Sequence, residues 1–351
     1  MERQTDQINI ANILLTQRCN LKCSYCHLVQ NYKNKPNEYP DVQEYAKNEL
    51  SAIGWIKIFK RLLQNNPQMF FILYGGEPFL YPEINEIVQW FHDNDVAYTI
   101  ITNNTDSVQD KIKLLHKQVG TIKGLSSSVD PIIYDYSQQG TDRFEKCFAG
   151  LQRLIKLKKD GIVDDVVAEI TADKGNINDL PALVKNLSDN GIWSDITTID
   201  HKGNEYYDFA ADAGDDLLLS GADVDTAFTA ILSHPDWLVH TRPILRKIQK
   251  DLPHNIKCYI HSDIHNVTID PTGHFRLCLR IRGVDTPLLS LDTVIAEDGI
   301  LKDNFSIALG KDFNKYCEGC GWPCIVASKE FSSEEIIDHV RSEDEENRDS
   351  D

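Results

Sequence analysis

The feature that most constrains the fold is an alternation of short apolar runs with helical patterns between about residues 10 and 200. The apolar or β-branched runs predicted as strands are 10–16, 69–74, 97–102, 121–129, 163–171 and 196–200. The helices predicted between them are 42–63, one opened by Pro82, 106–116, 143–159 and 180–187. Strands that alternate with helices usually pair in parallel through right-handed crossovers. The pattern predicts an α/β fold and leaves open whether the strands close into a barrel or form a doubly wound sheet.

The pattern changes after about residue 203. Helices near 221–233 and 242–251 are predicted to form a bridge. Strands 266–270 and 274–279 then flank an Asp-Pro-Thr-Gly turn, in which Gly273 allows positive φ. The final segment is rich in Glu and Asp and is predicted to end as a disordered tail. We therefore divide the chain into a core (1–205), a helical bridge (206–253), a cysteine-rich domain (254–331) and a short helix with an acidic tail (332–351).

The composition excludes several classes of protein. The 351 residues carry 36 basic and 54 acidic side chains, so the formal net charge is −18 and no basic footprint for nucleic acid is expected. No apolar run approaches the roughly 20 residues of a membrane span, and the polar N-terminus lacks the apolar region of a signal peptide. We expect a cytoplasmic protein without a membrane partner, in which clustered cysteines indicate metal or redox chemistry rather than disulfides.

Three cysteines directly follow the first predicted strand: Cys19, Cys23 and Cys26, with the spacing C-x3-C-x2-C. Three thiolates on one short loop can hold three corners of a 4Fe–4S cluster and leave one iron open to a small molecule. Tyr25 supplies an aromatic ring beside them. A zinc site with His27 as the fourth ligand is the main alternative, and a disulfide is another.

The spacing C-x3-C-x-aromatic-C after a first strand resembles the signature of radical S-adenosylmethionine (SAM) enzymes. Gly75-Gly76-Glu77-Pro78 follows the second predicted strand, where it resembles the GGEP motif of that family. Glycines let a ligand approach the backbone closely, and a carboxylate can bind an ammonium group. The resemblance implies that Gly75, Gly76 and Glu77 bind the methionine end of SAM, whereas a plain turn is the alternative interpretation.

Polar residues on later strands extend the resemblance. Asn103 lies at the end of the third predicted strand, Ser128 at the end of the fourth, and Glu169 on the fifth. Polar groups at these positions face the ribose and carboxylate of SAM in the family, which implies that role for Asn103 and Ser128. Polar capping of the strands is the alternative. Active-site groups at the carboxyl ends of strands are typical of α/β barrels.

The resemblance covers about residues 8–205 and implies a partial (β/α)6 barrel of the TIM type. It also implies a reduced 4Fe–4S cluster that cleaves SAM into methionine and a 5′-deoxyadenosyl radical, which abstracts a hydrogen atom from the substrate. An electron donor such as flavodoxin or ferredoxin would be a partner. The cofactor carries the difficult step, while the protein positions it and excludes water.

Five further cysteines lie in the last hundred residues: Cys258, Cys278, Cys317, Cys320 and Cys324. Their layout resembles SPASM and twitch domains, which add auxiliary 4Fe–4S clusters to radical SAM cores, although the late run C-x2-C-x3-C is shorter than the full SPASM pattern. Five thiols suffice for one fully ligated cluster and not for two. The resemblance implies one such cluster in a small C-terminal α+β domain, with either Cys320 or Cys324 as its fourth ligand. A zinc ribbon is the alternative.

Other chemically active residues are less constrained by the sequence. His201, His261 and Asp263 are candidate acid–base groups, because a His or Asp can take the proton released when a substrate radical is oxidised. His265 and Asp270 lie near them in sequence, and a structural role is the alternative for each. Trp322, between Cys320 and Cys324, is predicted to pack over the cluster rather than to bind substrate. Cys147 shares a helical face with apolar residues and is predicted to be a core thiol.

Three functions remain open from the sequence. The first is a radical SAM oxidoreductase that modifies a peptide or protein side chain. The second is a radical SAM enzyme that acts on a small metabolite, such as a nucleoside, a sugar or a cofactor precursor. The third is a non-catalytic zinc or iron–sulfur binding protein. Only about ten residues precede the first predicted strand, so an N-terminal peptide-recognition domain is not expected within this chain.

Overall fold

A computed structural model describes residues 8–21, 46–128, 143–198, 219–251, 266–276 and 295. Its strands are β1 Ile10–Thr16, β2 Phe70–Gly75, β3 Ala97–Thr102, β4 Ile122–Ser128, β5 Val163–Ala172, β6 Trp193–Thr198, β7 Asn266–Ile269 and β8 Phe275–Arg276. Its helices are α3 Ala52–Asn65, α4 Ile84–Asp93, α5 Asp106–Val119, α6 Arg143–Lys159, α7 Leu180–Asp189, α8 Gly221–Leu232 and α9 Arg242–Asp251, with the 3₁₀ turn η1 at Pro78–Leu80.

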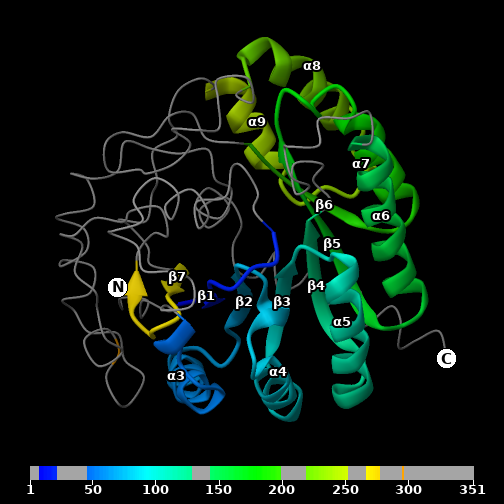
Figure 1. Cartoon of the computed structure of the whole chain (residues 1–351). Coiled ribbons are helices and arrows are strands. Elements are labelled where there is room, and N and C mark those ends of the chain that lie inside the picture. Colours follow the sequence, from blue (N-terminus) through cyan, green and yellow to red (C-terminus); the bar gives the residue numbers. More distant parts are fainter. Residues whose placement is uncertain are drawn as a thin grey trace, which may run out of the picture.

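The described strands form one sheet in the order β6-β5-β4-β3-β2-β1-β7-β8. Strands β6 to β7 in that order are parallel to one another, and β8 is antiparallel to β7. The sheet curls, and the helices from α3 to α7 lie along its outer face (Figure 1). This curled sheet is consistent with the predicted partial barrel, with seven parallel strands where the sequence pattern indicated six.

Several predicted elements agree with the structure to the residue, including strand β3 and helix α6. The first predicted helix is interrupted, because residues 48–51 are not helical and α3 begins at Ala52, while residues 42–45 lie outside the described part of the chain. Ser51 caps α3, since its Oγ accepts a hydrogen bond from the N–H of Gly54 at 3.3 Å. The N–H of Leu50 donates to the carbonyl of Pro271 at 2.8 Å, which draws the preceding backbone out of the helix.

Two other starts differ from the sequence pattern. Pro82 does not open α4, which begins at Ile84 with Glu83 as its N-cap. Strand β6 begins at Trp193 rather than at residue 196, because residues 193–195 pair in parallel with residues 167–169 of β5.

Aromatic packing joins the first two helices to the sheet. Phe59 on α3 is fully buried, and its ring centroid lies 5.1 Å from that of Phe71 on β2 and 5.0 Å from that of Phe91 on α4. The same ring stacks on Trp55 at 5.8 Å. Aromatic side chains remove large apolar areas from water, so this cluster is a main support of the β1–β3 end of the core.

The hairpin predicted from Asp-Pro-Thr-Gly is confirmed, although its described strands are shorter than predicted. Asp270 Oδ1 accepts from the N–H of Thr272 at 2.9 Å and from that of His274 at 3.1 Å, and Gly273 has a φ of 85°. Strand β7 pairs in parallel with β1. The hairpin therefore extends the sheet of the core at the edge that carries β1.

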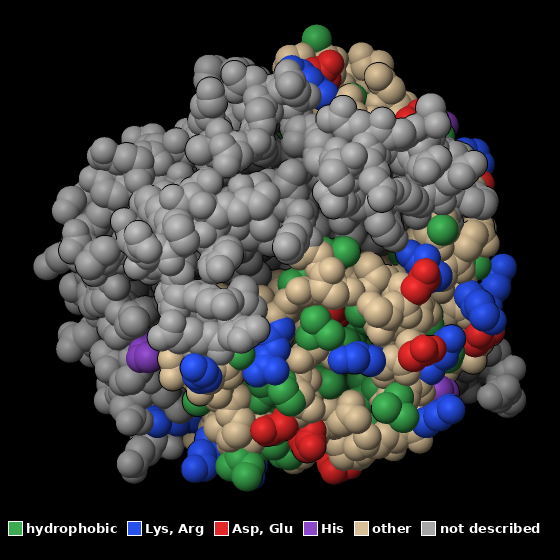
Figure 2. Space-filling view, in the orientation of Figure 1, with side chains coloured by type: hydrophobic (Ala, Val, Ile, Leu, Met, Phe, Trp, Pro, Cys, Tyr) green, Lys and Arg blue, Asp and Glu red, His purple; other side chains and the backbone are tan. Residues whose placement is uncertain are grey.

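The surface of the described helices mixes both signs of charge. On the face shown in Figure 2, Lys and Arg side chains are interspersed with Asp and Glu side chains over the part of the chain that is coloured. The excess of acidic residues therefore does not form one continuous acidic patch on the coloured part of this face. Among the described helices, none combines the length and the apolar character needed to cross a bilayer.

Replacing Phe59 by Ala is expected to lower the free energy of unfolding by about 3–5 kcal/mol, because it leaves a cavity among four aromatic rings. The matched control is Ile53→Ala on the same helix, where the side chain is 69 % exposed and the expected change is within about 0.5 kcal/mol. Urea unfolding followed by circular dichroism measures both values. Equal losses in the two variants would contradict the assignment of the core to this cluster.

Candidate active site

The predicted motifs meet at the carboxyl ends of three adjacent strands. Cys19 lies three residues after the end of β1, Gly76 follows β2, and Asn103 follows β3. Strands β1, β2 and β3 are neighbours in the sheet and run parallel, so these residues share one edge. That edge is where α/β barrels place their reactive groups.

Two glycines allow the loop after β2 to approach the backbone that leads to Cys19. The N–H of Gly76 donates to the carbonyl of Thr16 at 2.8 Å, and the N–H of Glu77 donates to the carbonyl of Arg18 at 2.7 Å. A Cβ atom at Gly76 would overlap the carbonyl of Arg18, and one at Gly75 would overlap that of Thr16. The close approach that requires these glycines is therefore between two protein backbones.

A third contact to the same backbone comes from Glu49, which the sequence analysis did not single out. Its Oε1 accepts from Thr16 Oγ1 at 2.6 Å, and its Oε2 lies 3.2 Å from Nε of Arg18. The Glu49 side chain is only 3 % exposed, so this ion pair is shielded on one side. No local spacing could have indicated it, since the partners lie about thirty residues away along the chain.

Glu77 is fully buried and connects the ends of β2 and β3. Its carboxylate accepts from Thr102 Oγ1 at 2.9 Å, from the N–H of Asn103 at 2.8 Å and from the N–H of Phe79 at 3.1 Å. Burial raises the pKa of Glu77 to about 7, although these hydrogen bonds and the charge of Lys111 act in the opposite direction. The resemblance implied that the Glu77 carboxylate binds the ammonium group of SAM. In this structure the carboxylate accepts hydrogen bonds from protein groups.

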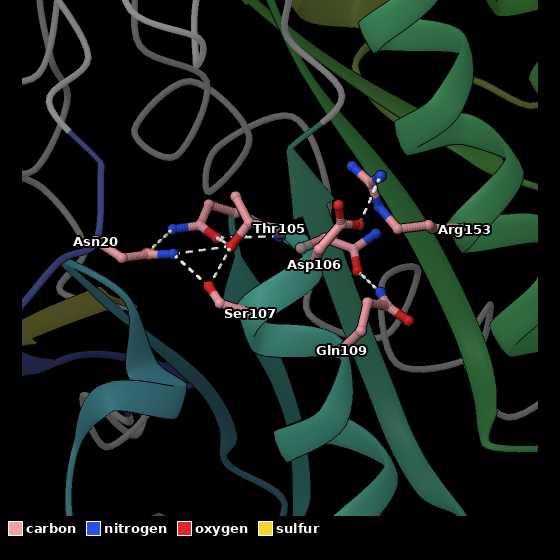
Figure 3. Close-up of polar contacts among 8 residues, drawn as sticks. Asn20, Thr105, Asp106, Ser107, Gln109 and Arg153 are labelled. Atoms are coloured by element: carbon pink, nitrogen blue, oxygen red, sulfur yellow. Dashed lines mark hydrogen bonds and ion pairs between the residues drawn. The ribbon is translucent and has the colours of Figure 1, made fainter.

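Asn103 links the cysteine loop to the start of α5. Its Nδ2 donates to Asn20 Oδ1 at 2.7 Å and to the sulfur of Cys19 at 3.9 Å. Asn20 in turn donates to Thr105 Oγ1 at 2.8 Å and to Ser107 Oγ at 3.0 Å (Figure 3). The loop that begins at Cys19 is therefore tied to β3 and α5 by side chains as well as to β2 by its backbone.

Polar residues occupy one row across strands β4, β5 and β6. Ser128, Glu169 and Asp195 are in register on the three strands, and Ser126 Oγ donates to Glu169 Oε1 at 2.6 Å. Burial raises the pKa of Asp195, and a hydrogen bond with the Thr241 side chain opposes that shift. The sequence pattern did not indicate Asp195, because the strand predicted at 196–200 begins one residue after it.

Many of the residues singled out from the sequence fall outside the described residues. They are Cys23, Tyr25, Cys26, His27, His201, Cys258, His261, Asp263, His265, Cys278, Cys317, Cys320, Trp322 and Cys324. Cys147 lies on α6, but its side chain is also outside the described set. Asp270 is described and holds the hairpin turn, which gives it a structural role there. Within the described ranges, no group of three potential ligands gathers closely enough for a metal ion.

The described part of the site fits a thiolate ligand at Cys19. The side chain is exposed at the strand ends, where a cofactor can reach it. Its sulfur accepts from the N–H of Leu21 at 3.4 Å as well as from Asn103. Donors that point at sulfur stabilise the deprotonated, metal-binding form of cysteine.

Residues 13–175 match the family profile of the Radical SAM superfamily. Among curated proteins, the chain is 24 % identical over 203 residues to the radical SAM cyclopropyl synthase TigE of Paramaledivibacter caminithermalis, covering 54 % of this chain and 42 % of TigE. It is 26 % identical over 188 residues to the GTP 3′,8-cyclase of Microcystis aeruginosa, covering 51 % and 53 %. It is 29 % identical over 187 residues to the antilisterial bacteriocin subtilosin biosynthesis protein AlbA of Bacillus subtilis, covering 50 % and 37 %. The matched regions span about half or less of each relative.

Solved structures share the fold over most of the chain. SuiB of Streptococcus suis bound to S-adenosylmethionine superposes with a TM-score of 0.58 at 15 % identity, covering 90 % of this chain and 73 % of SuiB. The enzyme anSMEcpe with bound AdoMet and the Cp18Cys peptide superposes with a TM-score of 0.51 at 14 % identity, covering 86 % and 82 %. Residues 13–175 therefore match the radical SAM superfamily model, and the solved structures share the fold of the chain.

Proposed function

We propose that this chain is a radical SAM oxidoreductase in which Cys19, Cys23 and Cys26 hold a 4Fe–4S cluster at the carboxyl ends of β1 to β3. Bound there, the cluster would supply the electron for reductive cleavage of SAM. The observation that carries the proposal is the placement of the exposed Cys19 beside Gly76 and Asn103. We propose flavodoxin or ferredoxin as the electron donor.

The remaining residues of the site position the loops that follow β1 and β2. The backbone at Gly75 and Gly76 fixes the start of the cysteine loop, and Glu77 fixes the β2 loop against β3. We assign the methionine end of SAM to the loop of residues 75–77, with the Tyr25 ring beside the cluster. Ser128, in register with Glu169 at the end of β4, is assigned to the ribose side.

We propose a peptide or protein side chain as the substrate. One relative supports this class by name, since AlbA serves the biosynthesis of the bacteriocin subtilosin. SuiB, which shares the fold, has been crystallised with its precursor peptide SuiA. The chain covers less than half of TigE and AlbA, so the substrate class is inferred from the shared core alone.

A small metabolite is the second candidate substrate. The match to a GTP 3′,8-cyclase is as strong in identity as the match to TigE, and it covers a similar share of this chain. Incubation with SAM and either GTP or candidate peptides distinguishes the two classes, because 5′-deoxyadenosine is formed in excess over the background only with the true substrate. Deuterium transfer from a labelled substrate into 5′-deoxyadenosine would identify the hydrogen that is removed.

We propose that the C-terminal cysteines hold one auxiliary 4Fe–4S cluster in a SPASM/twitch-like domain. The β7–β8 hairpin supports this, because β8 ends at Arg276, two residues before Cys278, and the hairpin is paired to β1. Cys278 would then ligate the cluster shortly after a strand that belongs to the sheet of the core. The remaining proposed ligands are Cys258, Cys317 and either Cys320 or Cys324.

Replacing Cys23 by Ala is expected to abolish dithionite-dependent formation of 5′-deoxyadenosine and to lower the iron content from about eight to about four atoms per chain. The measurement is iron, sulfide and nucleoside analysis after anaerobic reconstitution. Cys147→Ala on α6 is the matched control and is expected to keep both values. A wild-type protein that binds zinc and no sulfide would contradict the proposed function.

Replacing Cys278 by Ala is expected to retain SAM cleavage while preventing formation of the modified product. The physical reason is that an auxiliary cluster would take up an electron after the hydrogen atom has been removed, so its loss uncouples cleavage from product formation. Mass spectrometry of the substrate, alongside the 5′-deoxyadenosine yield, separates the two steps. Normal product yield in this variant would remove the auxiliary cluster from the proposal.

Replacing Glu77 by Gln is expected to change how stability depends on pH. Since burial raises the pKa of Glu77 from 4.5 to about 7, the folded protein holds this proton more tightly than the unfolded chain. Stability from this group is therefore full below about pH 4.5 and is lost as the pH rises through about 7, by about 3 kcal/mol. Urea unfolding from pH 5 to 8 should show a smaller decrease for the variant than for the wild type.

The control for Glu77 is Glu86→Gln, which changes an exposed carboxyl group on α4 and is expected to leave the wild-type slope in place. Parallel stability curves for Glu77→Gln and the wild type would show that Glu77 does not exchange its proton in this range.

A further inference from the structure

We propose that Asn103 is a positioning residue for Cys19, which it holds through an N–H···S hydrogen bond and through the amide of Asn20. This inference rests on the proposed function, because it concerns the thiolate that would ligate the cluster. It assigns to Asn103 a role toward the protein loop and the sulfur in place of the contact with SAM that the family resemblance implies.

The amide of Asn103 has no unused hydrogen-bonding capacity. Its two N–H bonds point to Asn20 Oδ1 at 2.7 Å and to Cys19 Sγ at 3.9 Å. Its oxygen accepts from the N–H of Thr105 at 3.2 Å and from Thr105 Oγ1 at 3.0 Å. A primary amide offers two donors and two acceptor sites, so all four are occupied by protein groups. A contact with SAM would require one of these bonds to break.

Asn20 is fixed from the opposite side. While its oxygen accepts from Asn103, its Nδ2 donates to Thr105 Oγ1 at 2.8 Å and to Ser107 Oγ at 3.0 Å, as Figure 3 shows for the labelled side chains. Thr105 is the residue that precedes the first turn of α5, and Ser107 lies within that turn. The residue next to Cys19 is therefore bound to a rigid helix end rather than to another loop.

The backbone of Asn103 is held as firmly as its side chain. Its N–H donates to Oε2 of the buried Glu77 at 2.8 Å, and Glu77 also binds Thr102. The donor that faces Cys19 thus comes from a position that is set by β3, by the β2 loop and by α5 together. A donor with this support does not lose much conformational freedom when a cofactor binds.

The hydrogen bond from Asn103 affects the electronic properties of the Cys19 sulfur. Cys19 Sγ has two N–H groups directed at it, from Leu21 and from Asn103. Hydrogen bonds to the sulfurs of an iron–sulfur cluster are one of the factors that set its reduction potential. They stabilise the more negative, reduced state, so removing the Asn103 donor is expected to make the potential more negative.

The test compares Asn103→Ala and Asn103→Asp with the matched control Asn85→Ala in the full-length, anaerobically reconstituted protein. Asn85 forms a similar amide–amide hydrogen bond, to Gln118 at 2.8 Å, but lies on the exposed surface between α4 and α5. The readout is the midpoint potential, measured without SAM by redox titration with electron paramagnetic resonance. The cluster is identified as the signal that changes when SAM is added.

For Asn103→Ala we expect the ratio of reduced to oxidised cluster at a fixed potential to fall about threefold, which corresponds to about 28 mV at 59 mV per tenfold for one electron. Asn103→Asp retains the acceptor for Thr105 and adds negative charge, so its potential is expected to be at least as negative. Asn85→Ala is expected to match the wild type. Because Asn103→Asp keeps the bonds to α5, it still gives a potential if the Ala variant does not fold.

Unchanged potentials in both Asn103 variants would overturn the inference, and so would an unchanged potential combined with weaker SAM binding, which would assign Asn103 to SAM. These outcomes leave the proposed function intact, since the wild type would still contain the cluster. A wild type without any SAM-responsive iron–sulfur signal would instead overturn the proposed function itself.

Discussion

The structure of the site depends on hydrogen bonds between two backbones beyond the ends of β1 and β2. Parallel strands normally separate where their ladder ends, yet here Gly76 and Glu77 continue to donate to Thr16 and Arg18. This is possible because no Cβ atom stands between the chains at Gly75 and Gly76. The start of the cysteine loop is consequently placed by main-chain atoms, whose geometry varies less than that of side chains.

Side chains from three other segments secure this arrangement. Glu49 binds Thr16 and Arg18 from the segment that precedes α3, the buried Glu77 connects the β2 loop with β3, and Asn103 connects β3 with Asn20. Each link joins segments that are far apart in sequence. Together they leave the thiol of Cys19 exposed while the backbone around it is fixed, which is the arrangement that a ligand to a cofactor requires.

The sequence predicted the strands, the helices and the motifs better than the hydrogen bonds that join them. The strand at 97–102 and the helix at 143–159 follow from periodicity, and the parallel order of strands follows from their alternation with helices. Glu49 and the Asn20–Asn103 pair were missed because their partners lie about 30 to 85 residues away, where no spacing rule applies. The early start of β6, and with it Asp195, depends on pairing with β5, which is a tertiary contact.

The C-terminal hairpin is connected to the cysteine loop through two consecutive residues. The N–H of Leu50 donates to the carbonyl of Pro271 in the hairpin turn, while the neighbouring Glu49 binds Thr16 and Arg18. A displacement of the turn would therefore move the backbone that carries the Glu49 carboxylate. Because β7 is also paired to β1, the hairpin and the first strand share both a ladder and this side-chain link. The β7–β8 hairpin, which precedes Cys278, is thus hydrogen-bonded to the same sheet as β1, which precedes Cys19.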